Sequence, residues 1–152
     1  MRREKYNTPH PDTTDVFEAE ITKIGLDSVI NIRVLVDDKL KPEIYKVSKC
    51  NDSEFFKTGD DVNIVLNEGI FIQLPDDLQK LAIIEILAGI SYDYDKDVPV
   101  ITKPDFHTYS GVIEKHSYEK MVVLKESIKS LMHAAKEAED ASKAATKKLG
   151  NL

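Results

Sequence analysis

Residues 61–91, DVNIVLNEGIFIQLPDDLQKLAIIEILAGIS, carry the strongest structural signals of the sequence. The first part of this stretch predicts a strand over residues 62–66, a turn at residues 67–69, and a short strand or helix lead-in over residues 70–73. Pro75 and the two carboxylates after it predict a helix start, because proline fits the first turn and acidic side chains suit the helix dipole. The helix that follows is apolar on nearly all sides, so we expect it at the centre of the core.

Ahead of this segment, the sequence predicts three further strands. Apolar and polar residues alternate over residues 17–22 and 30–36, and residues 43–48 have a similar strand-like composition. Residues 1–14 carry basic side chains and two prolines among polar residues, which is typical of a flexible tail. We therefore predict one α+β domain over residues 15–133, with a small mixed or antiparallel sheet, a buried central helix and a long C-terminal helix.

The C-terminal stretch predicts a helix with a coiled-coil seam. Its seam residues alternate at spacings of three and four: Met121, Leu124, Ile128, Leu131, Ala135, Ala138, Ser142, Ala145 and Leu149. Large residues give way to alanine along the seam, so residues 118–132 should pack on the domain and residues 134–152 should project as an arm. The arm is either solvated or packed against a partner helix or a second copy. The candidate partner-binding residues are Ala135, Ala138, Ala145 and Leu149.

Composition narrows the classes of function. The chain has 152 residues, a length that fits one compact domain. Its 21 basic and 27 acidic side chains give a net charge of −6, which argues against nonspecific binding to nucleic acid. No apolar run approaches the roughly 18 residues of a membrane-spanning helix, and the N-terminus lacks the apolar region of a secretory signal. Cys50 is the only cysteine, which excludes an internal disulfide and fits a reducing compartment.

The succession of strand, turn, acidic helix start and apolar helix resembles the zincin-like metallopeptidases encoded by bacteriophages. In that family, a similar helix start leads into an Asp-His-Glu-Leu-x-His box. Glu85 takes the place of the box's aspartate, Ile86 and Ile90 replace its two histidines, and Leu87 replaces its glutamate. Zinc hydrolysis needs imidazoles one helical turn apart and a carboxylate base. Aliphatic side chains supply neither, so the resemblance implies a peptidase scaffold with a catalytically inactive site.

A second stretch, KPDFHTYSGVIEKH at residues 103–116, resembles the His-Asp step with which these proteins open a later helix. The positions that fit are Asp105, Phe106, Tyr109, Val112, Ile113, Lys115 and His116. Pro104 stands where the family's remaining ligand histidine is expected, and Ser117 and Tyr118 depart from the family's usual ending. A helix is therefore expected from about Asp105. The resemblance extends from Ile21 to His116 and implies a degenerate member without zinc ligands.

Three acidic residues, Asp93, Asp95 and Asp97, have the spacing that begins a calcium loop. Such a loop also needs a glycine at its sixth position and a glutamate at its twelfth, and Val98 and Pro104 occupy those places. We therefore expect a solvated acidic loop over residues 91–99.

A second cluster, Asp105, His107 and His116, could bind a metal, but Asp105 suits a helix N-cap and His116 suits a helix end. Glu85 should lie at the rim of the core or pair with a basic side chain. We assign no catalytic, cofactor-binding or metal-binding residue.

The sequence as a whole predicts a non-catalytic phage protein on a pseudo-metallopeptidase scaffold. It would act by binding another protein or a second copy through its C-terminal helix, as a virion component or a host-takeover factor, in the host cytoplasm or the virion. No cofactor, nucleic acid or membrane is expected as a partner. One alternative is a metal-dependent hydrolase that uses a non-standard site at Asp105, His107 and His116. Another is a purely structural assembly protein held in place by its arm.

Overall fold

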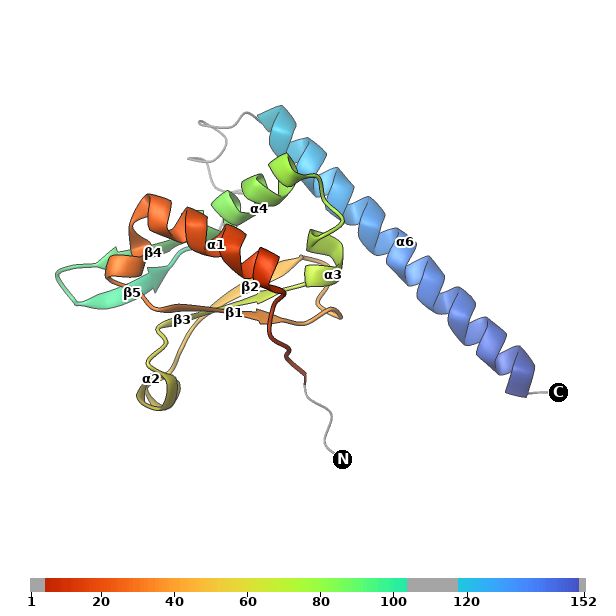
Figure 1. The fold of residues 1–152 in the computed structure, drawn as a ribbon, viewed down its shortest axis with the longest axis horizontal. Coiled ribbons are helices and arrows are strands. Elements are labelled where there is room, and N and C mark those ends of the chain that lie inside the picture. The colour runs from red at the N-terminus through yellow and green to blue at the C-terminus, as the bar shows by residue number, and fades with distance from the viewer. Residues whose placement is uncertain (1–4, 104–117, 151–152) are drawn as a thin grey trace.

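The computed structural model describes residues 5–103 and 118–150, with side chains of the last helix described up to Lys147. Its elements follow the chain in this order: α1 Pro11–Ile24, the 3-10 turn η1 Leu26–Ser28, β1 Ile32–Val36, β2 Tyr45–Lys49, α2 Asp52–Thr58, β3 Val62–Leu66, α3 Glu68–Phe71, α4 Asp76–Ala88, β4 Ile90–Asp93, β5 Val98–Ile101 and α6 Tyr118–Gly150 (Figure 1). This is the predicted α+β fold with its long C-terminal helix. Among the described residues, no helix is long and apolar enough to span a bilayer.

The main sheet has three strands in the order β1-β3-β2. β1 runs parallel to β3, with Val34 opposite Ile64, and β2 runs antiparallel to β3, with Val47 opposite the same residue. β3 is the central strand, and Val62, Ile64 and Leu66 are fully buried. β4 and β5 form a separate antiparallel hairpin. Of the two predicted possibilities, a mixed or an antiparallel sheet, the structure has the mixed one. Its buried central strand is β3, the apolar strand at the start of residues 61–91.

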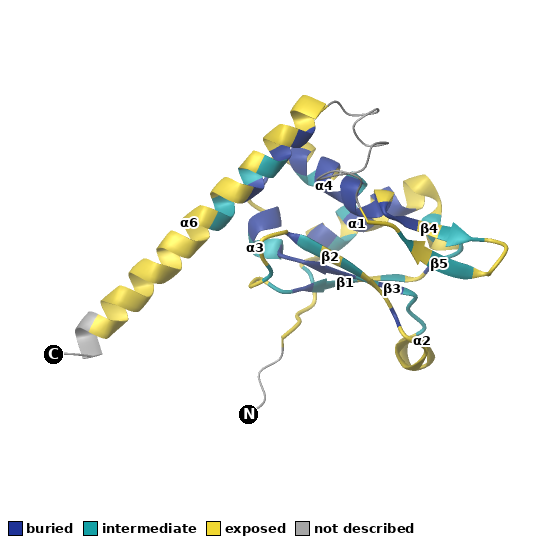
Figure 2. Cartoon of the chain, turned by 180° about the vertical axis from the view of Figure 1, so that it is seen from behind, coloured by how far each residue is buried: buried dark blue, intermediate teal, exposed yellow. Residues whose placement is uncertain are grey.

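Helix α4 lies in the middle of the core, as predicted. Ile83 and Ile86 have no solvent exposure, and the helix packs against α1, β4 and α6 (Figure 2). α1 and α3 lie on the same side of the main sheet as α4 and complete the core, where the rings of Phe17 and Phe71 meet with centroids 5.9 Å apart (Figure 1). Leu124 of α6 is also fully buried, so the first part of the last helix belongs to the same core.

The strand predicted for residues 17–22 is wrong, because these residues lie in α1. Phe17 and Ile21 alternate with glutamates, but they also stand one helical turn apart and share a buried face. The helix begins at Pro11, so residues 11–14 are helical rather than part of the predicted tail. His10 caps it by accepting the Asp12 N–H, and Gly25 ends it with a left-handed φ of 78°.

Two other local predictions are corrected. Asn67 does not start a plain turn, because its Oδ1 accepts the N–H of Ile70 and caps the short helix α3, which takes the place of the possible strand at residues 70–73. The predicted loop over residues 91–99 is instead most of the β4–β5 hairpin. The helix expected from about Asp105 lies outside the described residues.

Candidate protein-binding site on the C-terminal helix

The positions that correspond to the zinc box form part of the core. Ile86 is 0% exposed, Leu87 4% and Ile90 5%, as expected for aliphatic side chains that replace polar ligands. Ile86 and Leu87 lie in α4, as expected, but α4 ends at Ala88 and Ile90 opens β4. The expectation that Ile86 and Ile90 lie one turn apart on a single helix is therefore wrong, although both are buried. Over residues 5–103 and 118–147, no group of three histidine, cysteine or acidic side chains is arranged to hold a metal ion.

Glu85 is the polar member of this stretch and is 1% exposed. Lys125 Nζ of α6 lies 2.5 Å from its Oε1, and the Tyr45 hydroxyl of β2 donates to the same oxygen at 3.1 Å. Burial raises the pKa of Glu85 above the ordinary glutamate value, while the charge of Lys125 and its hydrogen bond oppose that rise. The predicted pairing of Glu85 with a basic side chain is confirmed, and the pair ties α4 to α6.

The first half of α6 is held on the domain by its seam. Met121, Leu124 and Ile128 are buried against α3 and α4, and Leu131 and Met132 are half-buried. All of these except Met132 are the large residues of the predicted heptad pattern. The seam and the Lys125–Glu85 pair together fix the direction in which the rest of the helix leaves the domain.

The second half of α6 leaves the domain entirely. Every residue from His133 to Lys147 is exposed, and the helix extends past the sheet as a free rod (Figure 2). Ala135, Ala138 and Ala145 are among these exposed residues, on the continuation of the buried seam. The side chain of Leu149, the fourth predicted partner-binding residue, lies outside the described residues. The alanine seam therefore has no partner within the described part of this chain.

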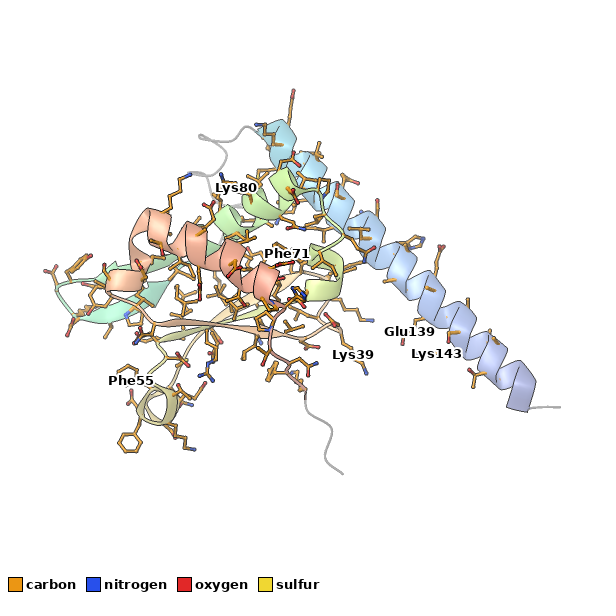
Figure 3. The ribbon with its side chains drawn as sticks, viewed as in Figure 1. Lys39, Phe55, Phe71, Lys80, Glu139 and Lys143 are labelled. Carbon is orange, nitrogen blue, oxygen red and sulfur yellow. The ribbon has the colours of Figure 1, made fainter. Side chains whose placement is uncertain are left out.

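Ion pairs on the arm are local to the helix. His133 pairs with Glu137 at 3.1 Å, and Glu139 pairs with Lys143 at 3.0 Å, each one turn apart. The hydrogen bond and charge of Lys143 lower the pKa of Glu139, with smaller contributions from the charges of two lysines on the β1–β2 loop. One of these, Lys39, extends from its loop toward the arm (Figure 3). These pairs favour the helix without covering its seam.

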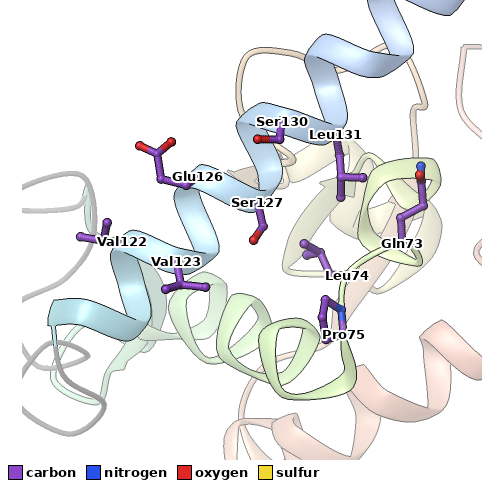
Figure 4. A pocket seen from close by; sticks show the side chains of 9 residues that line it. All are labelled: Gln73, Leu74, Pro75, Val122, Val123, Glu126, Ser127, Ser130 and Leu131. Atoms are coloured by element: carbon purple, nitrogen blue, oxygen red, sulfur yellow. The ribbon is translucent and has the colours of Figure 1, made fainter.

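An apolar groove runs beside the first half of α6, where the chain between α3 and α4 approaches the helix (Figure 4). It has a volume of about 510 Å³ and is lined by Gln73, Leu74, Pro75, Val122, Val123, Glu126, Ser127, Ser130 and Leu131. Val122 is 40% exposed and Val123 54%. The groove was not predicted from the sequence, although two adjacent valines beside the heptad seam, Val122 and Val123, could have indicated it.

The acidic residues of the β4–β5 hairpin serve its turn. Asp93 Oδ1 accepts the N–H groups of Asp95 and Lys96, and Asp97 accepts the Tyr92 hydroxyl. These contacts account for Asp93 and Asp97 as turn residues. The other candidate cluster of the sequence analysis, Asp105, His107 and His116, lies outside the described residues, and so does Pro104.

Comparison with models of known protein families, with curated proteins and with solved structures finds no match to this chain. The resemblance to phage metallopeptidases is therefore one of residue spacing within this sequence. The candidate site follows from the geometry of α6: an anchored half, an adjacent apolar groove and an exposed alanine seam.

Proposed function

We propose that this chain is a non-catalytic protein that acts by binding another protein, or a second copy of itself, through the exposed half of α6. The observation that carries the proposal is the continuous exposure of this helix from His133 to Lys147, beyond an anchored first half. The partner would pack along Ala135, Ala138 and Ala145, where small side chains let two helices approach closely.

The energetics of the arm support a partner. The exposed half of α6 has high helix propensity because of its alanines, but its described side chains make no buried contacts with the domain. Exposed ion pairs such as Glu139–Lys143 add little stability, because solvent screens them. Packing the seam against another helix would add the tertiary contacts that most protein helices depend on.

The non-catalytic part of the proposal is supported by the filled core at Ile86 and Ile90. As the family resemblance implies, we place the chain among phage proteins, as a virion component or a host-takeover factor in the host cytoplasm or the virion. Elemental analysis of the purified chain should find no stoichiometric zinc. A tightly bound zinc ion in each chain would contradict this part of the proposal.

Site-specific photo-cross-linking tests the arm. A photoreactive amino acid is placed at Ala138, on the seam, or at Ala144, which is also an alanine and lies about 120° away around the same helix. Irradiation in the producing cells should give a larger covalent product from position 138 and little from position 144. Equal products from the two positions, or none from either, would contradict binding through the seam.

A further inference from the structure

Along the outer edge of β1, some backbone groups have no hydrogen-bond partner among residues 5–103 and 118–150. Asn31 O accepts the Val62 N–H and the Asp37 N–H donates to Leu66 O, so the odd-numbered residues of this strand face β3. The even-numbered residues face the other way, as Val36 shows: its N–H and C=O both bond to Asn7, each at 2.9 Å. The N–H and C=O groups of Ile32 and Val34 therefore point outward along the same edge.

The chain's own N-terminal segment occupies only one end of that edge. After the bridge at Asn7, the segment turns toward α3, where the His10 N–H donates to Glu68 Oε2 at 2.9 Å. Within the described parts of the chain, no strand pairs with β1 beside Ile32 and Val34. The side chains of Ile32 and Val34 are both half-buried, so part of each remains accessible to solvent at this edge.

A cavity of about 510 Å³ lies at the start of this strand, between α1, the first residues of β1 and the end of α2. Its lining combines carboxylates with apolar side chains: Glu18, Asp27 and Asp60 with Ile21, Ile30 and Ile32. Among the described residues, only Asp60 of these carboxylates has an ion-pair partner, with Arg33 Nε 2.8 Å from its Oδ2. Glu18 and Asp27 are exposed, and Asp27 also accepts a hydrogen bond from the Thr22 hydroxyl at 3.4 Å. No basic residue that the structure describes lines the cavity, so its lining is negatively charged.

We propose that the outer edge of β1 binds an extended peptide segment that carries a lysine or arginine, with the basic side chain in this cavity. An added strand would bond to the free backbone groups of Ile32 and Val34 and place alternate side chains on one face. The carboxylates of Glu18 and Asp27 would meet the cationic head. The isoleucines would cover its alkyl stem. This surface is distinct from the arm and does not depend on the function proposed for it.

The test is fluorescence anisotropy with a labelled hexapeptide, Thr-Val-Arg-Val-Thr-Val, and its counterpart with glutamate in place of arginine. The full chain should bind the arginine peptide at least about tenfold more tightly, the order of one lost charge-assisted hydrogen bond. The double variant Glu18→Gln with Asp27→Asn should lose most of this preference. The matched variant Glu119→Gln with Asp140→Asn, exposed on α6, should keep it.

Two substitutions at one position test the backbone contact. Val34→Pro removes an outward N–H that the ladder with β3 does not use, and proline is tolerated at such edge positions. It should weaken the arginine peptide about tenfold, whereas Val34→Thr, which keeps the N–H, should not. Amide NMR of the unaltered chain provides an independent readout, with shifts expected at Asn31, Ile32 and Val34. The proposal would be overturned if both peptides bound equally well, or if a folded Val34→Pro variant bound the arginine peptide as tightly as the unaltered chain. Amide shifts confined to other elements would also overturn it.

Discussion

The two halves of α6 share one heptad seam but differ in what covers it. Met121, Leu124 and Ile128 are buried against the domain, while Ala135 and Ala138 continue the same stripe in solvent. The spacing of the seam is the same in both halves, so periodicity alone does not decide burial. Spacing determines which residues share one face of the helix. Side-chain size determines whether that face is buried against the domain.

Apolar area explains the difference. Burying a leucine, isoleucine or methionine side chain stabilises a fold by about 1.5–3 kcal/mol, whereas each buried methylene contributes only about 0.8 kcal/mol. Three large residues and the Lys125–Glu85 pair therefore anchor the first half, and a row of alanines cannot do the same for the second. The alanine seam of the arm therefore remains exposed, and its apolar contacts would have to come from a partner.

The largest expected effect is the difference in unfolding free energy between a core substitution in the first half of α6 and a substitution in the arm. Leu124→Ala should lower the free energy of unfolding by about 2–5 kcal/mol, because it leaves a cavity beneath a fully buried position. Ala138→Gly, on the arm, should cost no more than about 1 kcal/mol, the difference in helix propensity. Urea denaturation followed by circular dichroism measures both. Similar losses for the two variants would mean that the arm is part of the core.

A smaller effect is expected from the buried ion pair. Lys125→Met leaves the Glu85 carboxylate without its cation and should cost the lower part of the roughly 3–5 kcal/mol range for broken buried pairs, because Lys125 keeps 27% of its exposure. Lys129→Met, an exposed position on the same helix, should stay within about 0.5 kcal/mol.

The double variant Glu85→Leu with Lys125→Met removes both charges and should recover much of the loss, since apolar replacement of a buried pair is often neutral. Urea denaturation of the three variants measures these differences. If Lys125→Met alone is as stable as the unaltered chain, the pair does not anchor the first half of α6.

The same pair should give a pH dependence of known sign. Burial raises the pKa of Glu85 in the folded chain, so the folded state binds more protons than the unfolded state above the ordinary glutamate pKa of about 4.3. Its contribution to stability is therefore present at low pH and lost as pH rises through the folded pKa. Relative to Glu85→Gln, the unaltered chain should lose unfolding free energy from about pH 4.3 upward.

Denaturation series at several pH values measure this difference. The exposed substitution Glu126→Gln serves as the control and should show no such trend. A stability difference between the unaltered chain and Glu85→Gln that grows in favour of the unaltered chain as pH rises would contradict the raised pKa.

Much of the fold could be predicted from the sequence because several signals were local and strong. β3 and the start of α4 lie within one stretch of residues 61–91, where an apolar run and a Pro-Asp-Asp step indicate them. The heptad spacing also predicts α6. The Lys125 partner of Glu85 could not be predicted, because it lies 40 residues away and on another helix.

The failures came from short elements and from mixed patterns. α1 alternates like a strand over residues 17–22, and its helical face becomes clear only when Thr13 and Glu20 are counted as buried. α2 buries no residue, and its signal was the capping box of Asn51 and Glu54. The open edge of β1 depends on strand pairing, which no local pattern in the sequence reveals.

Truncation after Ala134 tests most directly the claim that α6 is an anchored helix with a free, partner-binding end. Urea denaturation of the shortened chain should give an unfolding free energy within about 0.5 kcal/mol of the full chain, because every removed side chain that the structure describes, up to Lys147, is exposed. A loss of about 2 kcal/mol or more, the size expected for a large-to-small substitution in the core, would show that the arm is part of the core and not a free end of α6.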